Sequence, residues 1–205
     1  MTTTQEPEYD PFVPDSNQFE HLPTKASTDV YRRVGASLAA YNRILLQPLD
    51  VQLRSGWNPD RDSGSKVGLQ EARSRIAVTF QQEMVDAIQA SGRYTVATGA
   101  GADVLEVRPR IIDLYVKAVD DAANAGSNVS TYEVHDAELT FAGDLSDSMT
   151  GTVLYRVYDH RTAGVGTLQL KTTEDRNLQL RKLAAHWAKQ LIDALDAARA
   201  SATGS

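Results

Sequence analysis

The sequence has 205 residues and a formal net charge of −6, with 41% apolar and 7% aromatic residues. A chain of this length fits one domain that buries a sizeable core without disulfides or a metal. It contains no cysteine, which excludes disulfides, thiolate zinc sites and cysteine nucleophiles.

Acidic residues are concentrated at the N-terminus. Residues 1–27 hold five acids, one lysine and four of the seven prolines, whereas the other 178 residues hold 22 acids and 20 bases. The first segment cannot bury enough apolar surface to offset its ordering entropy. We therefore interpret residues 1–27 as an extended acidic tether, residues 28–200 as a single α+β domain, and residues 201–205 as a disordered tail or cloning remnant. The nearly neutral domain lacks a basic face, so we expect no nucleic-acid partner.

The first predicted strand covers residues 43–53, after ordered chain begins near Tyr31. Apolar and polar residues alternate in its second half, as they do in a half-buried strand. Pro48 cannot donate a ladder hydrogen bond, so this strand either lies at a sheet edge or is bulged there. A polar loop is expected over residues 57–68.

More strands are predicted at residues 94–98, 104–119, 130–141, 150–158 and 167–171. Turns are expected at 143–148 and 159–164, and a loop at 122–128. These connections are too short for crossover helices, so the middle of the sheet should be antiparallel.

Two long helices are predicted at residues 69–91 and 175–200, because apolar residues recur there at three- and four-residue spacing. The two stripes are Leu69, Ala72, Ile76, Phe80, Met84 and Ile88, and Leu180, Leu183, Trp187, Leu191, Ala194, Leu195 and Ala198. The expected fold class is α+β, an antiparallel-rich sheet of about five strands with two long helices packed on one face.

Two blocks of the sequence resemble a known family. The first comprises Tyr31-Arg32-Arg33-Val34-Gly35, Leu38, Tyr41 and the strand Ile44–Leu49 with its proline; the second comprises Asp147–Leu154, Asp159-His160-Arg161 and Trp187. Over residues 28–198 the chain resembles domain-of-unknown-function family 3313, whose members are mostly predicted bacterial lipoproteins.

The resemblance implies an exported protein at the periplasmic face of the outer membrane, lipid-anchored through an N-terminal cysteine. This sequence has no cysteine, and Met1–Glu6 lack the features of a signal peptide. We expect that both were removed from the native chain, and that residues 2–27 connect the anchor to the domain. The expected partners are envelope proteins or a second copy of the chain, with membrane contact only through the missing lipid anchor.

Asp159, His160 and Arg161 form the one candidate polar cluster. Asp often hydrogen-bonds its own backbone in turns, so a structural turn is the favoured interpretation. Asp147 with Thr150-Gly151 is likewise interpreted as a turn, and Gly99-Ala100-Gly101 as a strand connection without a phosphate-binding lysine. The sequence offers no catalytic residue, no cofactor-binding residue and no metal-ligand set, and no cofactor is expected.

Three functions therefore remain open. The first is a non-catalytic envelope domain that acts through protein–protein contact. The second is a lipid- or small-molecule-binding module of an envelope transport system, which requires an apolar cleft between helices and sheet. The third is a hydrolase that uses Asp159 and His160, which requires both to converge in one pocket.

Overall fold

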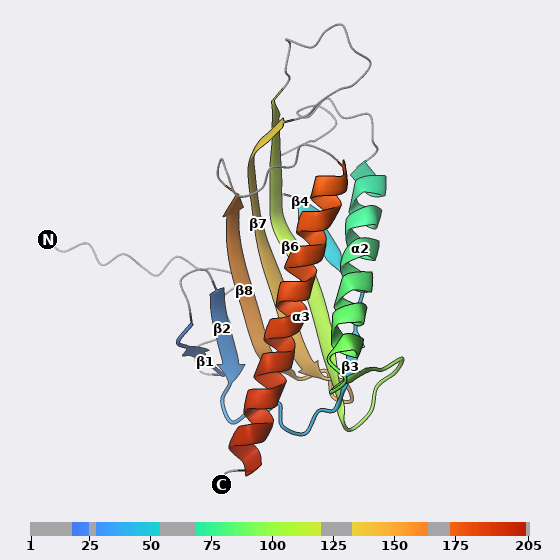
Figure 1. Ribbon diagram of the computed structural model, residues 1–205. Helices are drawn as coiled ribbons and strands as arrows, with labels where there is room; N and C mark the ends of the chain where they lie inside the picture. Colours follow the sequence, from blue (N-terminus) through green and yellow to red (C-terminus); the bar gives the residue numbers. More distant parts are fainter. Residues whose placement is uncertain (1–17, 25–27, 54–68, 120–132, 164–172, 204–205) are drawn as a thin grey trace, which may run out of the picture.

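Two helices lie across one face of a mixed sheet in the computed structural model of this chain (Figure 1). The structure describes residues 18–24, 28–53, 69–119, 133–163 and 173–203. The strands are β1 (Phe19–Leu22), β2 (Thr28–Arg33), β3 (Arg43–Leu46), β4 (Asp50–Leu53), β5 (Thr95–Val96), β6 (Val104–Val119), β7 (Glu133–Asp147) and β8 (Val153–Ala163), and the helices are α2 (Leu69–Ala90) and α3 (Thr173–Thr203). The α+β prediction is confirmed, with eight described strands where about five were expected.

The sheet is mostly antiparallel, in the order β1-β2-β8-β7-β6-β3-β5, with β4 also paired to β6. The centre, β8-β7-β6, is antiparallel as predicted. β3 and β4 instead run parallel to β6, because α2 and the chain around it separate them from β6 in sequence and allow a crossover.

Pro48 divides the predicted strand 43–53 into β3 and β4. Both halves pair with the same strand, β6, on either side of Pro109. Neither proline has an N–H to donate, so the hydrogen-bond ladder is interrupted where the two prolines face each other. Pro48 therefore lies both at the edge of the sheet and at an interruption of its hydrogen-bond ladder.

The predicted turns at 143–148 and 159–164 were wrong over most of their length. β7 continues to Asp147, and β8 continues to Ala163. Asp144 and His160 keep exposed surface, whereas their neighbours Leu145 and Asp159 are buried, so the alternation of a strand continues through these positions. Between β7 and β8 the tight turn is instead formed by Asp147–Gly151.

The core lies between the helices and the sheet. The stripe of α2 is buried at Phe80, Met84 and Ile88, and that of α3 at Trp187, Leu191 and Leu195. Ala194 is exposed, contrary to prediction; α3 buries Ala184, Ala188 and Ile192 instead. Because α3 contacts both α2 and the sheet, it buries a wider apolar stripe than a helix that packs against a single neighbour.

Ordered chain begins earlier than Tyr31. β1 lies inside the predicted tether and pairs with β2, and β2 starts at Thr28, the predicted domain boundary. Phe19 anchors β1, because the guanidinium of Arg33 lies 4.7 Å from its ring centre. Tether residues 1–17 and 25–27, the predicted loops at 57–68 and 122–128, and the predicted strand at 167–171 lie outside the described residues.

Candidate functional site

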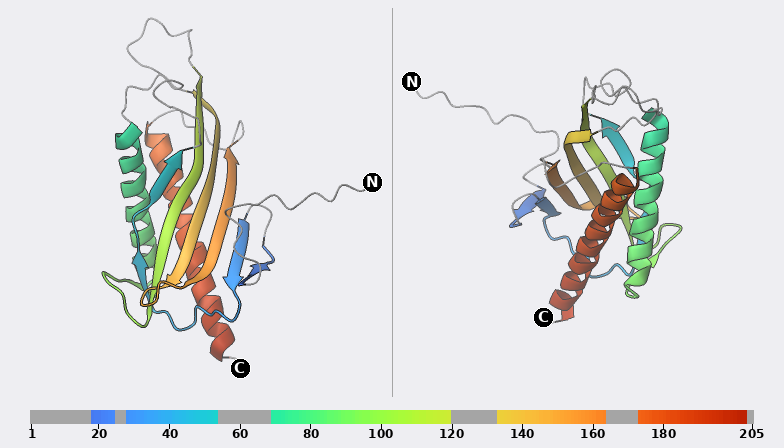
Figure 2. Two further views of the ribbon diagram at one scale, coloured as in Figure 1. Left: turned by 180° about the vertical axis from the view of Figure 1, so that it is seen from behind. Right: turned by 45° about the horizontal axis from the view of Figure 1, so that its top comes forward.

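The sheet has one covered face and one face without a helix over it (Figure 2). On the central strands, side chains alternate between the core below the helices and this second face, which we call the open face. Its central residues are Glu106, Arg108, Arg110, Ile112, Thr140, Ala142, Asp144, Arg156, Tyr158 and His160, with Asp29 and Tyr31 from β2 beside them.

The predicted polar cluster does not exist as a unit. Asp159 is 0% exposed and faces the helices, where its Oδ2 accepts a 2.9 Å hydrogen bond from Trp187 Nε1. His160, the next residue on β8, is exposed on the open face. The side chain of Arg161 lies outside the described residues. Because neighbours on a strand point to opposite faces, Asp159 and His160 cannot share the pocket that the hydrolase hypothesis requires.

Trp187 fills the space between α3 and the sheet. Its ring stacks on Phe141, with 3.5 Å between ring centres and 18° between planes, and the ring centre of Phe80 lies 5.6 Å from that of Trp187. Three aromatic rings therefore fill space between the helices and the sheet, which is where the small-molecule hypothesis requires a cleft.

An Arg–Asp–Arg trio, formed by Arg110, Asp144 and Arg156, crosses the centre of the open face on three adjacent strands. Arg110 Nη2 donates a 3.0 Å hydrogen bond to Asp144 Oδ2, and Arg156 Nε lies 3.2 Å from Asp144 Oδ1. The arginine side chains are 33% and 29% exposed, and Asp144 is 14% exposed. Two cations share one carboxylate, so this half-buried trio carries one excess positive charge.

A small apolar cluster lies beside the trio on the same face. Ile112, Ala142 and Tyr158 are buried, and the ring of Tyr31 meets Tyr158 edge-on at 6.1 Å. Burial raises the pKa of Tyr158, with the charge of Arg156 acting in the opposite direction. The open face is thus partly desolvated at its centre.

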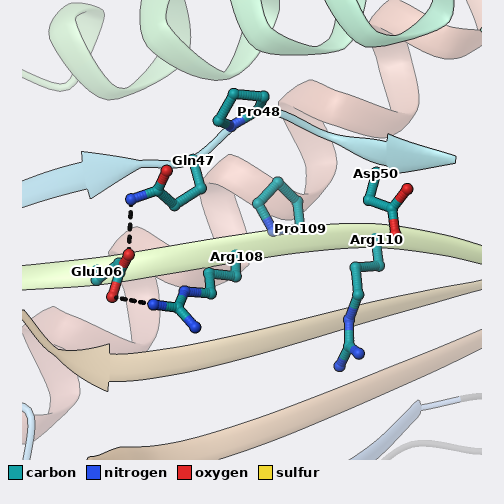
Figure 3. A pocket seen from close by; sticks show the side chains of 7 residues that line it. All are labelled: Gln47, Pro48, Asp50, Glu106, Arg108, Pro109 and Arg110. Carbon is teal, nitrogen blue, oxygen red and sulfur yellow. Dashed lines mark hydrogen bonds and ion pairs between the residues drawn. The ribbon is translucent and has the colours of Figure 1, made fainter. Parts of the chain in front are cut away.

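A groove of about 360 Å³ opens where Pro48 interrupts the sheet (Figure 3). It is lined by Gln47, Pro48, Asp50, Glu106, Arg108, Pro109 and Arg110. Glu106 is only 6% exposed, and its two oxygens accept hydrogen bonds from Gln47 Nε2 at 2.6 Å and Arg108 Nη2 at 3.0 Å. These bonds hold one wall of the groove in place, next to the trio.

Two histidines flank one carboxylate toward the edge of the open face. His21 Nε2 lies 3.0 Å from Asp29 Oδ1, and His160 Nε2 lies 3.9 Å from Asp29 Oδ2. Thr140 Oγ1 is 3.0 Å from His160 Nδ1. His21 was predicted to lie in the tether, so this contact, which depends on the pairing of β1 with β2, was missed.

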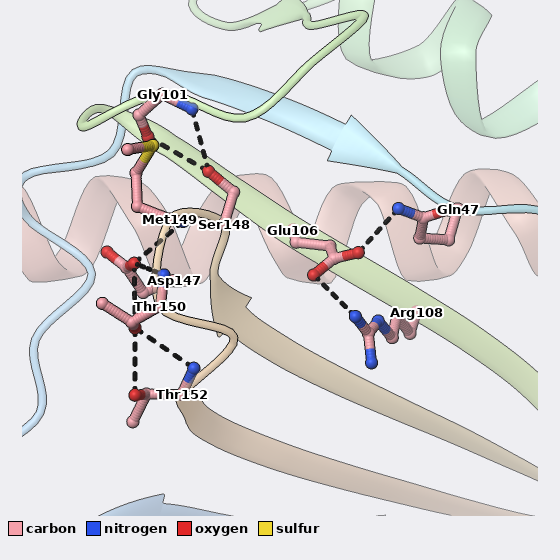
Figure 4. A network of polar contacts seen from close by, with 9 residues as sticks. All are labelled: Gln47, Gly101, Glu106, Arg108, Asp147, Ser148, Met149, Thr150 and Thr152. Carbon is pink, nitrogen blue, oxygen red and sulfur yellow. Dashed lines mark hydrogen bonds and ion pairs between the residues drawn. The ribbon is translucent and has the colours of Figure 1, made fainter.

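The Asp147 turn is structural, as predicted (Figure 4). Asp147 Oδ1 accepts hydrogen bonds from Met149 N, Thr150 N and Thr150 Oγ1, and Oδ2 accepts one from the Tyr41 hydroxyl at 2.9 Å. The Thr150 amide, followed by Tyr41, lowers the pKa of Asp147. Burial, followed by Asp147, raises the pKa of Tyr41 to about 12.

Ser148 joins this turn to the β5–β6 connection. Its hydroxyl donates to Gly101 O and accepts from Gly101 N, both at 3.1 Å. The glycines at 99 and 101 therefore serve a strand-to-strand connection, as predicted, and not a phosphate loop. The two sequence blocks that suggested a family also meet here, since Tyr41 belongs to the first and Asp147 to the second.

The family model described as "Protein of unknown function (DUF3313)" matches residues 8–191. The chain belongs to this family. The matched residues include the turn around Asp147 and the contact between Asp159 and Trp187. No curated protein matches the sequence.

Solved structures give more distant likenesses. The PelC dodecamer from Paraburkholderia phytofirmans has 10% identity and a TM-score of 0.41, over 82% of this chain and 96% of that chain. The minor lipoprotein from Acinetobacter baumannii has 14% identity and a TM-score of 0.37, over 74% and 92%. The rare lipoprotein B from Shewanella oneidensis has 10% identity and a TM-score of 0.34, over 79% and 99%. At these scores no function is carried across.

Neither described helix is long and apolar enough to cross a membrane. Within the same described ranges, no three His, Asp or Glu side chains are grouped so as to hold a metal ion. The features that distinguish the open face are its charged side chains, its apolar cluster and its groove.

Proposed function

We propose that this chain is a non-catalytic domain of the bacterial cell envelope that binds another protein through the open face of its sheet. The observation that carries the proposal is the Arg–Asp–Arg trio, Arg110, Asp144 and Arg156, held half-buried on a face that no described helix covers. Arginine is enriched at protein interfaces, where its planar donors pair with partner groups.

The site on the open face suits contact better than catalysis. Glu106 and Asp144 are each engaged by an arginine, and Asp29 by a histidine. Groups held in such pairs provide a fixed pattern of charge for recognition. The packed aromatic rings of Phe80, Phe141 and Trp187 also favour this proposal over a ligand cleft under the helices.

An envelope location is part of the same proposal. It is supported by membership of the DUF3313 family, for which the sequence resemblance implies a lipoprotein, and by the acidic, proline-containing residues that precede β1. The native protein would be lipid-anchored at the periplasmic face of the outer membrane, with the open face available to a neighbouring envelope protein or to a second copy.

Site-specific photo-crosslinking in the native bacterium tests this proposal. Arg108 on the open face and Arg181 on α3 are a matched pair, because their side chains are 56% and 58% exposed and each pairs with one glutamate. A photoreactive residue at position 108 should give a discrete protein adduct in the envelope fraction, and one at position 181 should not. Adducts at neither position, or at 181 alone, would refute the proposal.

A further inference from the structure

The Arg–Asp–Arg trio holds two positive charges and one negative charge. Counting ion pairs within 4 Å, Arg108 has its own carboxylate, Glu106, whereas Arg110 and Arg156 share Asp144. Asp50, opposite Arg110 on β4, is hydrogen-bonded to Gln52 and makes no ion pair with Arg110 in the described structure. One positive charge at the centre of the open face is therefore left without a carboxylate of its own.

The surroundings strengthen the ionic interactions that this positive charge can make. The buried cluster of Ile112, Ala142 and Tyr158 removes water from one side of the trio. An ionic interaction in such a place is stronger than one between fully solvated side chains. The side chains of Arg110 and Arg156 are nevertheless 33% and 29% exposed, although the Nε atom of each is buried, so an incoming group can reach the exposed part of each side chain.

The groove extends this site along β6. Arg110 belongs both to the trio and to the groove lining, which also includes Pro48. A chain that placed a carboxylate between Arg110 and Arg156 would have its neighbouring residue beside this recess. Arginine pairs favour carboxylates, because their N–H groups can bind both oxygens.

We infer that the partner presents an acidic protein segment, one carboxylate of which binds between Arg110 and Arg156 while the adjoining residue occupies the groove at Pro48. This inference rests on the proposed function and names the chemistry of its partner. It assigns Arg110 and Arg156 as the anchors of the interface.

The test uses the full chain and a fluorescein-labelled decaglutamate peptide, with binding followed by fluorescence anisotropy at low salt. The wild-type chain should bind it, with affinity falling as salt screens the charges. The double variant Arg110→Gln/Arg156→Gln should bind about tenfold more weakly. Arg181→Gln, on α3, should bind within about twofold of wild type.

A second variant guards against loss through misfolding. Asp144→Asn keeps the side-chain shape and raises the charge of the trio by one, so it should bind decaglutamate about fivefold more tightly. Unfolding would weaken binding instead. Unchanged or weaker binding by folded Asp144→Asn, or equal binding by wild type and the double arginine variant, would overturn the inference.

Two further outcomes separate the possible occupants. If removal of residues 2–17, which hold four acids and no lysine or arginine, tightens decaglutamate binding tenfold or more, the face belongs to the protein's own N-terminal segment and the inference is wrong. If crosslinks at position 108 persist while decaglutamate does not bind, the acidic-segment inference fails and the proposed function stands. Absence of those crosslinks refutes the function itself.

Discussion

Trp187 Nε1 donates a hydrogen bond of 2.9 Å to Asp159 Oδ2, and both side chains are buried between α3 and β8. A carboxylate in such a place is costly unless hydrogen bonds compensate its lost hydration. This contact joins the C-terminal helix to the sheet and fixes the face of α3 that lies on Phe141.

Replacement of Trp187 by Phe should therefore destabilise the protein by about 2 kcal/mol, because the ring still packs but Asp159 loses a donor. Asp159→Ala should cost more than Asp159→Asn, which keeps an oxygen at this place. Urea unfolding measures both. A Trp187→Phe variant within about 0.5 kcal/mol of wild type would show that the contact contributes little.

The Asp147 turn should make stability depend on acid pH. The folded-state pKa of Asp147 lies below the ordinary 3.8, so its stabilisation is present above that value and lost as pH falls through the lower folded-state pKa. Asp147→Asn should be about 1 kcal/mol less stable at pH 7, and the difference should shrink below pH 3.8. Thermal unfolding at a series of pH values measures this difference. A stability difference that stays constant down to about pH 2, or that grows on acidification, would contradict this account.

Gly151 closes the same turn with φ of +68°, a conformation that residues with a Cβ adopt at a cost. Gly151→Ala should therefore destabilise the protein by about 1 kcal/mol. Gly99→Ala is the matched control, since a Cβ there would meet nothing within 4 Å and φ is not in the left-handed range. If the two variants have equal melting temperatures, the positive φ of Gly151 does not contribute to stability as proposed.

Arg199 connects the end of α3 to two other segments. Its Nη2 donates to Tyr41 O at 2.9 Å, and its guanidinium lies 4.6 Å from the Tyr94 ring centre. Arg199→Ala should cost about 1–2 kcal/mol through these two losses. Lys189→Ala, which removes only an exposed ion pair with Asp193, should cost less than about 0.5 kcal/mol in the same denaturation experiment.

The helices and the central strand β6 were predictable because their periodicity is long and uninterrupted. Phe80, Met84 and Ile88 repeat at four-residue spacing, and Val104–Val119 was predicted with its observed bounds. The continuation of β8 through Asp159 was missed, because Asp favours turns locally. A tertiary hydrogen bond from Trp187, 28 residues away in the chain, overrides that preference.

The open face was less accessible to prediction for a different reason. Arg110, Asp144 and Arg156 lie on three separate strands, so their contact depends on strand register, which alternation within each strand does not specify. The charge of each residue is visible in the sequence, but the sharing of one carboxylate by two arginines is not. The same holds for Asp29, which meets histidines from β1 and β8.

Covalent footprinting of two histidines tests the central claim most directly. His160 on the open face and His186 on α3 are both exposed in the isolated chain. The native protein is treated with diethyl pyrocarbonate in intact envelopes and again after purification, and modification of each histidine is quantified by mass spectrometry. We predict that His160 is protected in envelopes while His186 reacts equally in both states; equal reactivity of His160 in both states would contradict the assignment of the open face as the interaction surface.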